Sequence, residues 1–187
     1  MLGAIRHTFK YLDIDSFVLL YKSLIRPHLE YATVIWDPKT KRDKDMVERV
    51  QRRATKLVPS ISHLPYSQRL RALGLPTLLF RRKRADIILL YKITHGLVTC
   101  RTSNHCNLCS RAMLTPSLAT STRGHSYKYQ IQCSKGPRAN FYPARVIPMW
   151  NKLSEQTVTS KSVNLFKSRL SAEWTTHKDL YEYEFSY

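Results

Sequence analysis

Two cysteines, Cys106 and Cys109, are separated by two residues, which is the spacing of paired ligands in many zinc sites. Further candidate ligands surround this pair: Cys100, His105, His125 and Cys133. Thiolates and imidazoles are the ligands that Zn²⁺ prefers in proteins. The intervals from Cys109 to His125 and Cys133 are irregular, so two interpretations stay open: a zinc site and ordinary free thiols in a loop. No other cofactor is expected.

No arrangement of residues in the sequence indicates an enzyme. There is no nucleophile elbow, no glycine-rich phosphate loop and no HExxH metal motif, and the chain has only five glycines. Two-metal polymerases and nucleases need clustered carboxylates, but the 13 Asp and Glu residues are scattered. The pair Asp13 and Asp15 suggests either a metal site or a helix cap, and capping accounts for both side chains. We therefore expect no catalytic residues and no reaction catalysed by this chain alone.

Charge is the strongest signal in the composition. The 187 residues include 31 Lys and Arg, which gives a formal net charge of +18, and no acidic residue lies between Ile87 and Ser154. A folded chain with this imbalance repels itself, and its usual partner is a polyanion, most often nucleic acid and less often an acidic membrane surface or protein. Apolar runs long enough for a membrane span or a signal peptide are absent, so the nucleus or cytoplasm is the expected location and no membrane partner is expected.

Three clusters of cations are candidates for contacts with phosphates rather than with bases. One lies on a predicted helix in residues 39–58, the second precedes Gly74, and the third opens a helix that follows Pro76 and Thr77. The ten candidates are Arg49, Arg52, Arg53, Lys56, Arg69, Arg71, Arg81, Arg82, Lys83 and Arg84. A solvated surface is the simpler interpretation of one basic helix face, and the last four residues also permit a nuclear-localisation signal.

Residues 16–36 form the segment that positions these clusters. Apolar residues at helical spacing predict one buried face along it: Phe17, Leu20, Tyr21, Leu24, Tyr31, Ala32 and Ile35. Pro27 lies in the middle of this segment and removes one backbone hydrogen bond. We therefore expect either two helices in series or one kinked helix, with the break near Arg26.

Helical periodicity continues on both sides of this segment. It predicts a helix in residues 2–11, a helix in residues 39–58 capped by Asp43 or Asp45, a helix in residues 65–73, and a longer one that ends at Gly96. The apolar positions of the second are Met46, Val47, Val50, Ala54, Leu57 and Val58. A short strand is predicted in residues 127–133. Two final helices, in residues 141–153 and 162–174, pair Val146, Met149, Trp150 and Leu153 with Leu165, Phe166, Leu170 and Trp174.

The predicted fold is therefore mainly α. A small helical bundle in residues 1–97 is followed by a loop-rich insertion or linker in residues 98–126, a C-terminal helical segment in residues 127–176 and a tail in residues 177–187.

Several phrases of the sequence resemble the C-terminal region of reverse transcriptases from non-LTR retrotransposons, the LINE-type elements of the jockey-like lineage. They are Leu2-Gly3 to Thr8-Phe9, FVLLYKSLIRPHLEYATVIWDP from Phe17, VERVQRRATK from Val47, RLRALGLPTL from Arg69, Arg81-Arg82 to Tyr91-Lys92-Ile93, and the segments 141–153 and 162–174. The resemblance covers most of residues 1–174, and the first hundred residues match most specifically.

This resemblance implies a helical thumb domain followed by a post-thumb segment of an RNA-directed DNA polymerase. The basic residues would then grip the phosphates of RNA or of an RNA–DNA hybrid beside an upstream polymerase palm. The paired palm aspartates of that family are absent from this sequence, so the resemblance implies binding without catalysis. The alternatives are a transposon-derived relic that acts as a protein-interaction module without a nucleic-acid role, and a chain that completes an enzyme with a separate palm.

Overall fold

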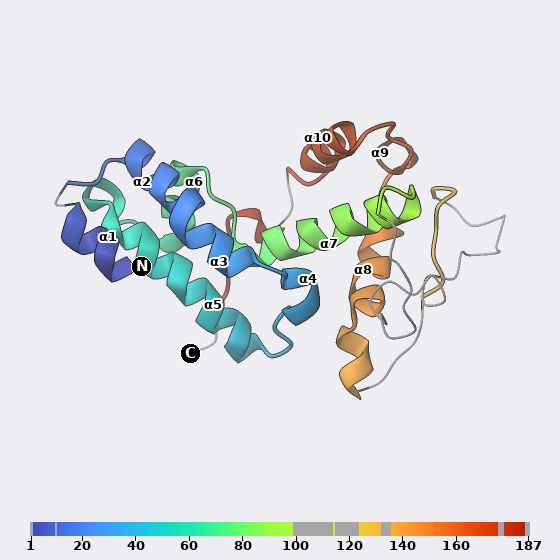
Figure 1. The fold of residues 1–187 in the computed structure, drawn as a ribbon, viewed down its shortest axis with the longest axis horizontal. Helices are drawn as coiled ribbons and strands as arrows, with labels where there is room; N and C mark the ends of the chain where they lie inside the picture. Colours follow the sequence, from blue (N-terminus) through green and yellow to red (C-terminus); the bar gives the residue numbers. More distant parts are fainter. Residues whose placement is uncertain are drawn as a thin grey trace. The chain divides into compact units, whose positions relative to one another are not determined.

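The computed structural model describes residues 2–9, 11–98, 114, 124–131, 136–175 and 178–185. Helices make up most of these residues and no strand occurs among them, which confirms the predicted mainly α fold (Figure 1). The chain forms two compact units: the first contains Met1–Arg82 and Thr176–Tyr187, and the second contains Lys83–Thr175.

The two units divide inside helix α7 (Leu78–Thr94), whereas composition suggests a boundary at residue 97. The dividing point lies between Arg82 and Lys83, inside one uninterrupted helix, so no loop marks it. The C-terminal tail belongs to the first unit. Its attachment is made by Thr77, whose backbone N–H donates to the carbonyl O of Leu180 over 3.0 Å and whose hydroxyl donates to the carbonyl O of Asp179 over 2.6 Å.

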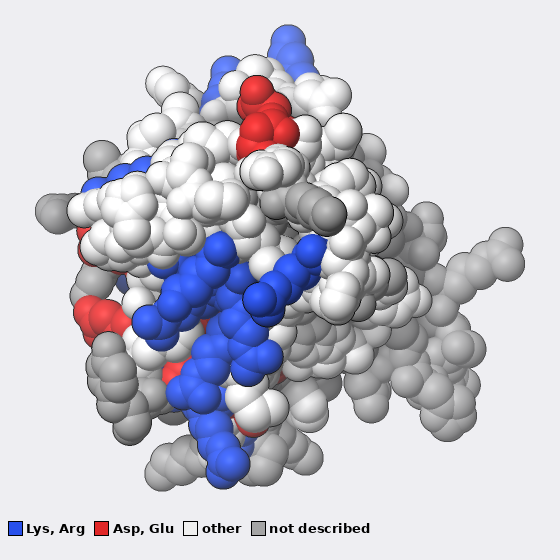
Figure 2. All heavy atoms as spheres, turned by 90° about the vertical axis from the view of Figure 1, so that its left-hand side faces the viewer, with Lys and Arg blue, Asp and Glu red and all other residues white. Residues whose placement is uncertain are grey.

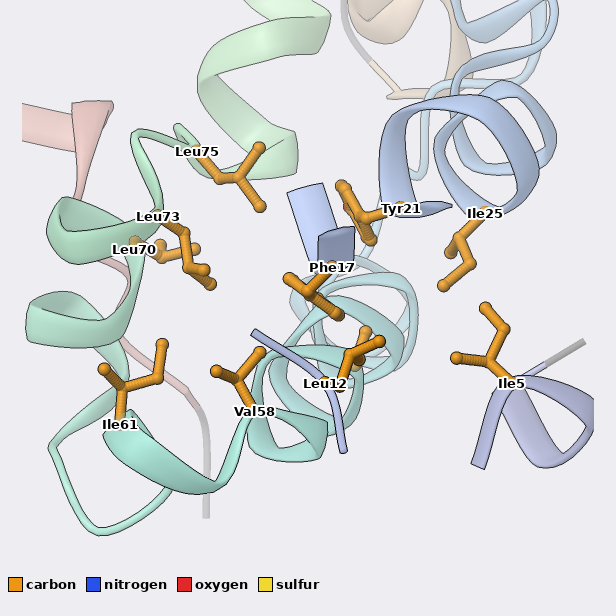
Figure 3. Close-up of a cluster of buried hydrophobic side chains, with 11 residues drawn as sticks. Ile5, Leu12, Phe17, Tyr21, Ile25, Val58, Ile61, Leu70, Leu73 and Leu75 are labelled. Atoms are coloured by element: carbon orange, nitrogen blue, oxygen red, sulfur yellow. The ribbon is translucent and has the colours of Figure 1, made fainter. Parts of the chain in front are cut away.

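Short helices joined by tight turns build the first unit. Before α7 they are α1 (Leu2–Thr8), α2 (Ile14–Leu20), α3 (Arg26–Glu30), α4 (Thr33–Trp36), α5 (Lys41–Ala54) and α6 (Tyr66–Leu73). A π-helical turn, Tyr21–Ile25, joins α2 to α3, and the 3₁₀ turns Thr55–Leu57 and Pro59–Ile61 follow α5. Their buried side chains meet in one apolar core (Figure 3): Ile5, Leu12, Phe17, Tyr21, Ile25, Ala54, Val58, Ile61, Leu70, Leu73 and Leu75.

The break predicted near Arg26 is present, and a π-helical turn makes it. The backbone N–H of Arg26, the first residue of α3, donates to the carbonyl O of Tyr21, five residues back. The next residue, Pro27, has no N–H to donate. The wider turn brings Phe17, Tyr21 and Ile25 onto the buried face at intervals of four residues.

The predicted apolar face is therefore only partly correct. Leu24, Tyr31 and Ile35 are exposed, because the π-helical turn changes the phase of the helix and Ala32, at φ 51°, interrupts it again before α4. These exposed apolar side chains remain on the surface of the first unit.

Helix α5 begins with a different cap from the predicted one. Thr40 is the N-cap: its Oγ1 accepts the backbone N–H of Asp43 over 3.1 Å and donates to the Asp43 carboxylate over 2.7 Å. Asp45 is buried and accepts a hydrogen bond from Tyr183. The prediction of Asp43 or Asp45 as the cap was wrong, as was the buried position of Met46, which is 56% exposed.

Two local predictions are confirmed by cap geometry. Asp13 caps α2, because its carboxylate accepts the N–H of Ser16 over 3.2 Å. Gly74 ends α6 in the left-handed conformation at φ 59°, and the N–H of Leu75 reaches back to the carbonyl O of Leu70. This Schellman arrangement explains why a glycine stops the helix at that residue.

The second unit contains the last turns of α7 together with α8 (Tyr142–Trp150), α9 (Glu155–Val158) and α10 (Val163–Glu173). The predicted pairing of the final helices is present in its core: Trp150 and Phe166 are fully buried with ring centroids 6.2 Å apart, and Tyr91 of α7 stacks on Phe166 at 4.1 Å. Leu165 was predicted to be in this interface but lies at its margin, 39% exposed.

The strand predicted in residues 127–133 is absent from the described part of that segment, residues 127–131. The backbone of Tyr129 bonds instead to the amide of Asn151, with its N–H donating to Oδ1 over 3.1 Å and its carbonyl accepting from Nδ2 over 2.8 Å. The side-chain amide of Asn151 thus bonds to both backbone polar groups of Tyr129.

A membrane-spanning helix would need both length and a strongly apolar sequence. None of the helices in the described part of the chain has both.

Candidate nucleic-acid interface

The outward face of α5 carries the most accessible cations among the predicted candidates. Arg49, Arg53 and Lys56 are all exposed, and intervals of four and three residues place them on one side of the helix and of the turn that continues it. At about 1.5 Å per residue they extend over about 10 Å. Figure 2 shows Lys and Arg side chains of the first unit gathered in a continuous strip.

Arg42 extends this row by two turns toward the start of α5. It is exposed and lies seven residues before Arg49 on the same face. We call Arg42, Arg49, Arg53 and Lys56 the α5 ridge. Arg42 was missed in the sequence, although its spacing of seven from Arg49 was a usable signal.

Among the described residues, none forms an ion pair or hydrogen bond with the side chain of a ridge cation. Six carboxylates of the first unit are engaged elsewhere: Glu30 with Arg81, Asp37 with Arg82, Asp43 with Thr40, Asp45 with Tyr183, Glu48 with Tyr66, and Glu182 with Arg71. The positive charge of the ridge is therefore not neutralised from within the unit.

A buried polar face of α5 turns the ridge outward. Asp45, Glu48 and Gln51 are at most 2% exposed. Gln51 accepts a hydrogen bond from the Tyr21 hydroxyl at Oε1 and donates one from Nε2 to the carbonyl O of Pro76 over 3.0 Å. Since every one of these polar groups has partners from other parts of the chain, α5 has one orientation in which they are satisfied.

Glu48 is the centre of this polar face. Its carboxylate accepts the Tyr66 hydroxyl over 2.7 Å and the backbone N–H of Leu78, at the start of α7, over 3.1 Å and 3.3 Å to its two oxygens. A carboxylate at a helix N-terminus also meets the positive end of the helix dipole. Burial nevertheless raises the pKa of Glu48, and the hydrogen bonds oppose that shift only in part.

Arg69 and Arg82 were predicted to contact phosphates, but both are buried at 3% exposure. Arg69 donates from Nε to the Thr55 hydroxyl over 3.0 Å and from Nη1 to the carbonyl O of Leu64 over 2.6 Å. Arg82 has its Nε 2.8 Å from Oδ1 of Asp37, and its N–H groups are not aligned for a hydrogen bond, so charge holds this pair. A phosphate outside the protein cannot reach either guanidinium.

Four other candidates also have interactions within the protein. Arg81 forms a two-pronged ion pair with Glu30, with Nη2 and Oε2 2.7 Å apart. Arg84 donates to the hydroxyl of Ser171 over 3.1 Å. Lys83 is half-buried and engaged as well, and Arg71 forms an exposed ion pair with Glu182 at 3.1 Å. These four residues thus differ from the ridge cations in that each already has an interaction.

Arg52 lies beside the ridge and is covered by the C-terminal segment. Its guanidinium carbon is 4.7 Å from the ring centre of Phe185, a cation–π contact. Tyr183, two residues earlier, donates its hydroxyl to the buried carboxylate of Asp45 over 2.8 Å. No periodicity in the acidic, aromatic tail indicated this position.

The possible zinc ligands Cys100, Cys106, Cys109 and Cys133 lie outside the described residues, as does His105. His125 is buried, with Nε2 2.9 Å from the carbonyl O of Trp150. Within the described residues, no three His, Cys, Asp or Glu side chains gather in a way that would hold a metal ion.

Comparison of the chain with protein-family models, with curated proteins and with solved structures finds no match.

Proposed function

We propose that this chain acts as the thumb and C-terminal part of a retrotransposon-type reverse transcriptase and grips RNA or an RNA–DNA hybrid through its phosphates. The observation that carries the proposal is the α5 ridge, a row of exposed cations without internal partners on a protein of net charge +18. Guanidinium and ammonium groups bind phosphates by charge and position a strand without reading its sequence.

In this proposal the chain binds nucleic acid and does not catalyse a reaction. Asp13 serves as a helix cap, Glu30 as an ion-pair partner and Glu48 as a buried acceptor, and none of these is a role in the two-metal chemistry of a polymerase. Polymerisation would require an upstream palm as a partner. The proposed location is the nucleus or the cytoplasm, where RNA is present.

Titration of the full chain against a labelled RNA–DNA hybrid at several salt concentrations tests this function. Phosphate binding predicts that the logarithm of affinity falls linearly with the logarithm of salt concentration, by roughly 0.7 to 0.9 per contacted phosphate. The variant Arg49→Ala/Arg53→Ala/Lys56→Ala is expected to bind more weakly and to reduce the magnitude of this slope by roughly 2 to 3.

The matched control removes three exposed cations from scattered positions, Lys22→Ala/Lys152→Ala/Lys161→Ala. Its net charge equals that of the ridge variant, but it is expected to retain most of the affinity and of the slope. Equal losses in both variants would show that net charge alone drives binding, and our placement of the interface would be wrong.

One observation favours the alternative of a protein-interaction module. Leu19, Tyr31 and Ile35 expose 70%, 79% and 68% of their surfaces in the first unit, and exposed apolar groups of this kind suit a protein partner. An apolar interface would not follow the salt law of phosphate binding. A folded chain that binds no hybrid at low salt would favour this alternative.

A further inference from the structure

The C-terminal segment, residues 178–185, covers a flank of α5 next to the ridge. Thr77 anchors its beginning through bonds to the backbone of Asp179 and Leu180, and Tyr183 anchors its middle through the buried carboxylate of Asp45. Between and beyond these anchors, two side chains reach cations of the first unit. Glu182 pairs with Arg71 at 3.1 Å, and the ring of Phe185 lies 4.7 Å from the guanidinium of Arg52.

The chemistry of these two contacts matches that of a nucleotide. A carboxylate on Arg71 offers the oxygen acceptors that a phosphate would offer to the same guanidinium. An aromatic ring over Arg52 offers the π face that an unpaired base would offer. Arg52 is three residues from Arg49 and four from Lys56, so a strand on the ridge passes within reach of it.

We infer that Arg52 and Arg71 form a second row of the interface, which binds single-stranded RNA and is occupied in the free protein by Phe185 and Glu182. A phosphate of the strand displaces the Glu182 carboxylate from Arg71, and an unpaired base displaces the Phe185 ring from Arg52. The inference rests on the proposed function, because it requires RNA on the α5 ridge.

The difference in exposure between the Arg71–Glu182 ion pair and the anchor at Asp45 supports this exchange. Arg71 and Glu182 are each 56% exposed, so solvent screens their attraction and a competing anion can approach. The anchor at Asp45 is only 2% exposed and hydrogen-bonded. The ring of Phe185 also contacts the rings of Tyr66 and Tyr183, with centroids 6.0 Å and 4.9 Å away, so a base that displaces it replaces these contacts as well. The backbone of the segment stays in place at its anchors while Glu182 and Phe185 turn away from their partners.

Affinity measurements on the full chain test the inference, with two probes of equal length: a single-stranded RNA and an RNA–DNA hybrid duplex. Glu182→Gln frees Arg71 for a phosphate, so we expect about threefold or more tighter binding to both probes and a salt slope for the single strand steeper by about 0.7. Phe185→Leu keeps an apolar side chain but removes the ring. We expect a similar gain for the single strand and none for the duplex, whose bases are paired.

The control Asp15→Asn removes one exposed negative charge from α2 of the same unit and is expected to change neither affinity. Unchanged binding by Glu182→Gln and Phe185→Leu would overturn the inference and leave the ridge standing. An equal gain in Asp15→Asn would overturn it too, because general charge would then explain the effect. Absence of binding by the natural chain would overturn the proposed function and, with it, the inference.

Discussion

Replacement of Glu48 by alanine is expected to lower the free energy of unfolding of the first unit by about 3 kcal/mol. The change removes the carboxylate that accepts hydrogen bonds from the Tyr66 hydroxyl and the Leu78 N–H. Glu48 is fully buried, so water does not replace the lost acceptor. An unsatisfied buried donor costs about 1–3 kcal/mol. Faster hydrogen exchange at the amides of α5 and of the first turn of α7 would report the loss for this unit specifically.

Glu48→Gln is the matched variant, because its amide oxygen still accepts a hydrogen bond and its volume is almost unchanged. It should cost less than Glu48→Ala at any pH. Equal losses in the two variants would show that packing of the side chain, and not acceptance of hydrogen bonds, is what Glu48 contributes.

The difference in unfolding free energy between the natural chain and Glu48→Gln should also depend on pH. Burial raises the pKa of Glu48 from its ordinary value of 4.5, so the folded protein holds this proton more tightly than the unfolded chain. The contribution of Glu48 to stability is thus complete below pH 4.5 and is lost as the pH rises through the folded value. Chemical unfolding at pH 4.5 and pH 7 should show the natural chain losing stability relative to Glu48→Gln. A constant difference would contradict the raised pKa.

Local signals in the sequence were sufficient for the fold class and for three of the four ridge residues. Pro27 and Gly74 act on the backbone within one turn of themselves, so their effects on helix boundaries could be predicted from chemistry alone. The spacing of Arg49, Arg53 and Lys56 is likewise a property of one helix. Each of these predictions depends only on residues within a few positions of one another in the chain.

The polar face of α5 could not be predicted in this way. Asp45, Glu48 and Gln51 look like surface residues in the sequence, and apolar positions such as Met46 look like the buried ones. Their burial depends on Tyr183, Tyr66 and the carbonyl of Pro76, which are 138, 18 and 25 residues away in the chain. A pattern within one helix contains no information about partners at such distances.

Arg69 makes the same point for the candidate site, and its removal is the second large effect that we expect. Its guanidinium donates to the Thr55 hydroxyl and to the carbonyl oxygens of Leu64 and, at 3.5 Å, Arg52. Arg52 belongs to the last turn of α5, where carbonyl oxygens lack partners within the helix and a cation is favourable. Arg69 therefore acts as a buried cap for the end of the helix that carries the ridge.

Arg69→Met keeps much of the side-chain volume and removes every donor, so we expect it to destabilise the first unit by about 3 kcal/mol. Arg53→Ala, on the exposed face of the same region, should stay within about 0.5 kcal/mol of the natural chain. Hydrogen exchange in α5 and α6 measures the stability of both variants. Titration against the hybrid at several salt concentrations measures how each variant changes the salt slope. Where both variants are folded, Arg53→Ala should reduce the slope and Arg69→Met should not.

The opposite pattern would reverse our assignment of the two arginines. If Arg69→Met were as stable as the natural chain and reduced the salt slope by about one phosphate, Arg69 would have to reach the nucleic acid. That result requires the guanidinium to leave Thr55 and Leu64, and the burial of Arg69 at 3% argues against it. Two arginines 16 positions apart, similar in a basic sequence, are thus separated by one physical criterion: whether their donors already have partners inside the protein.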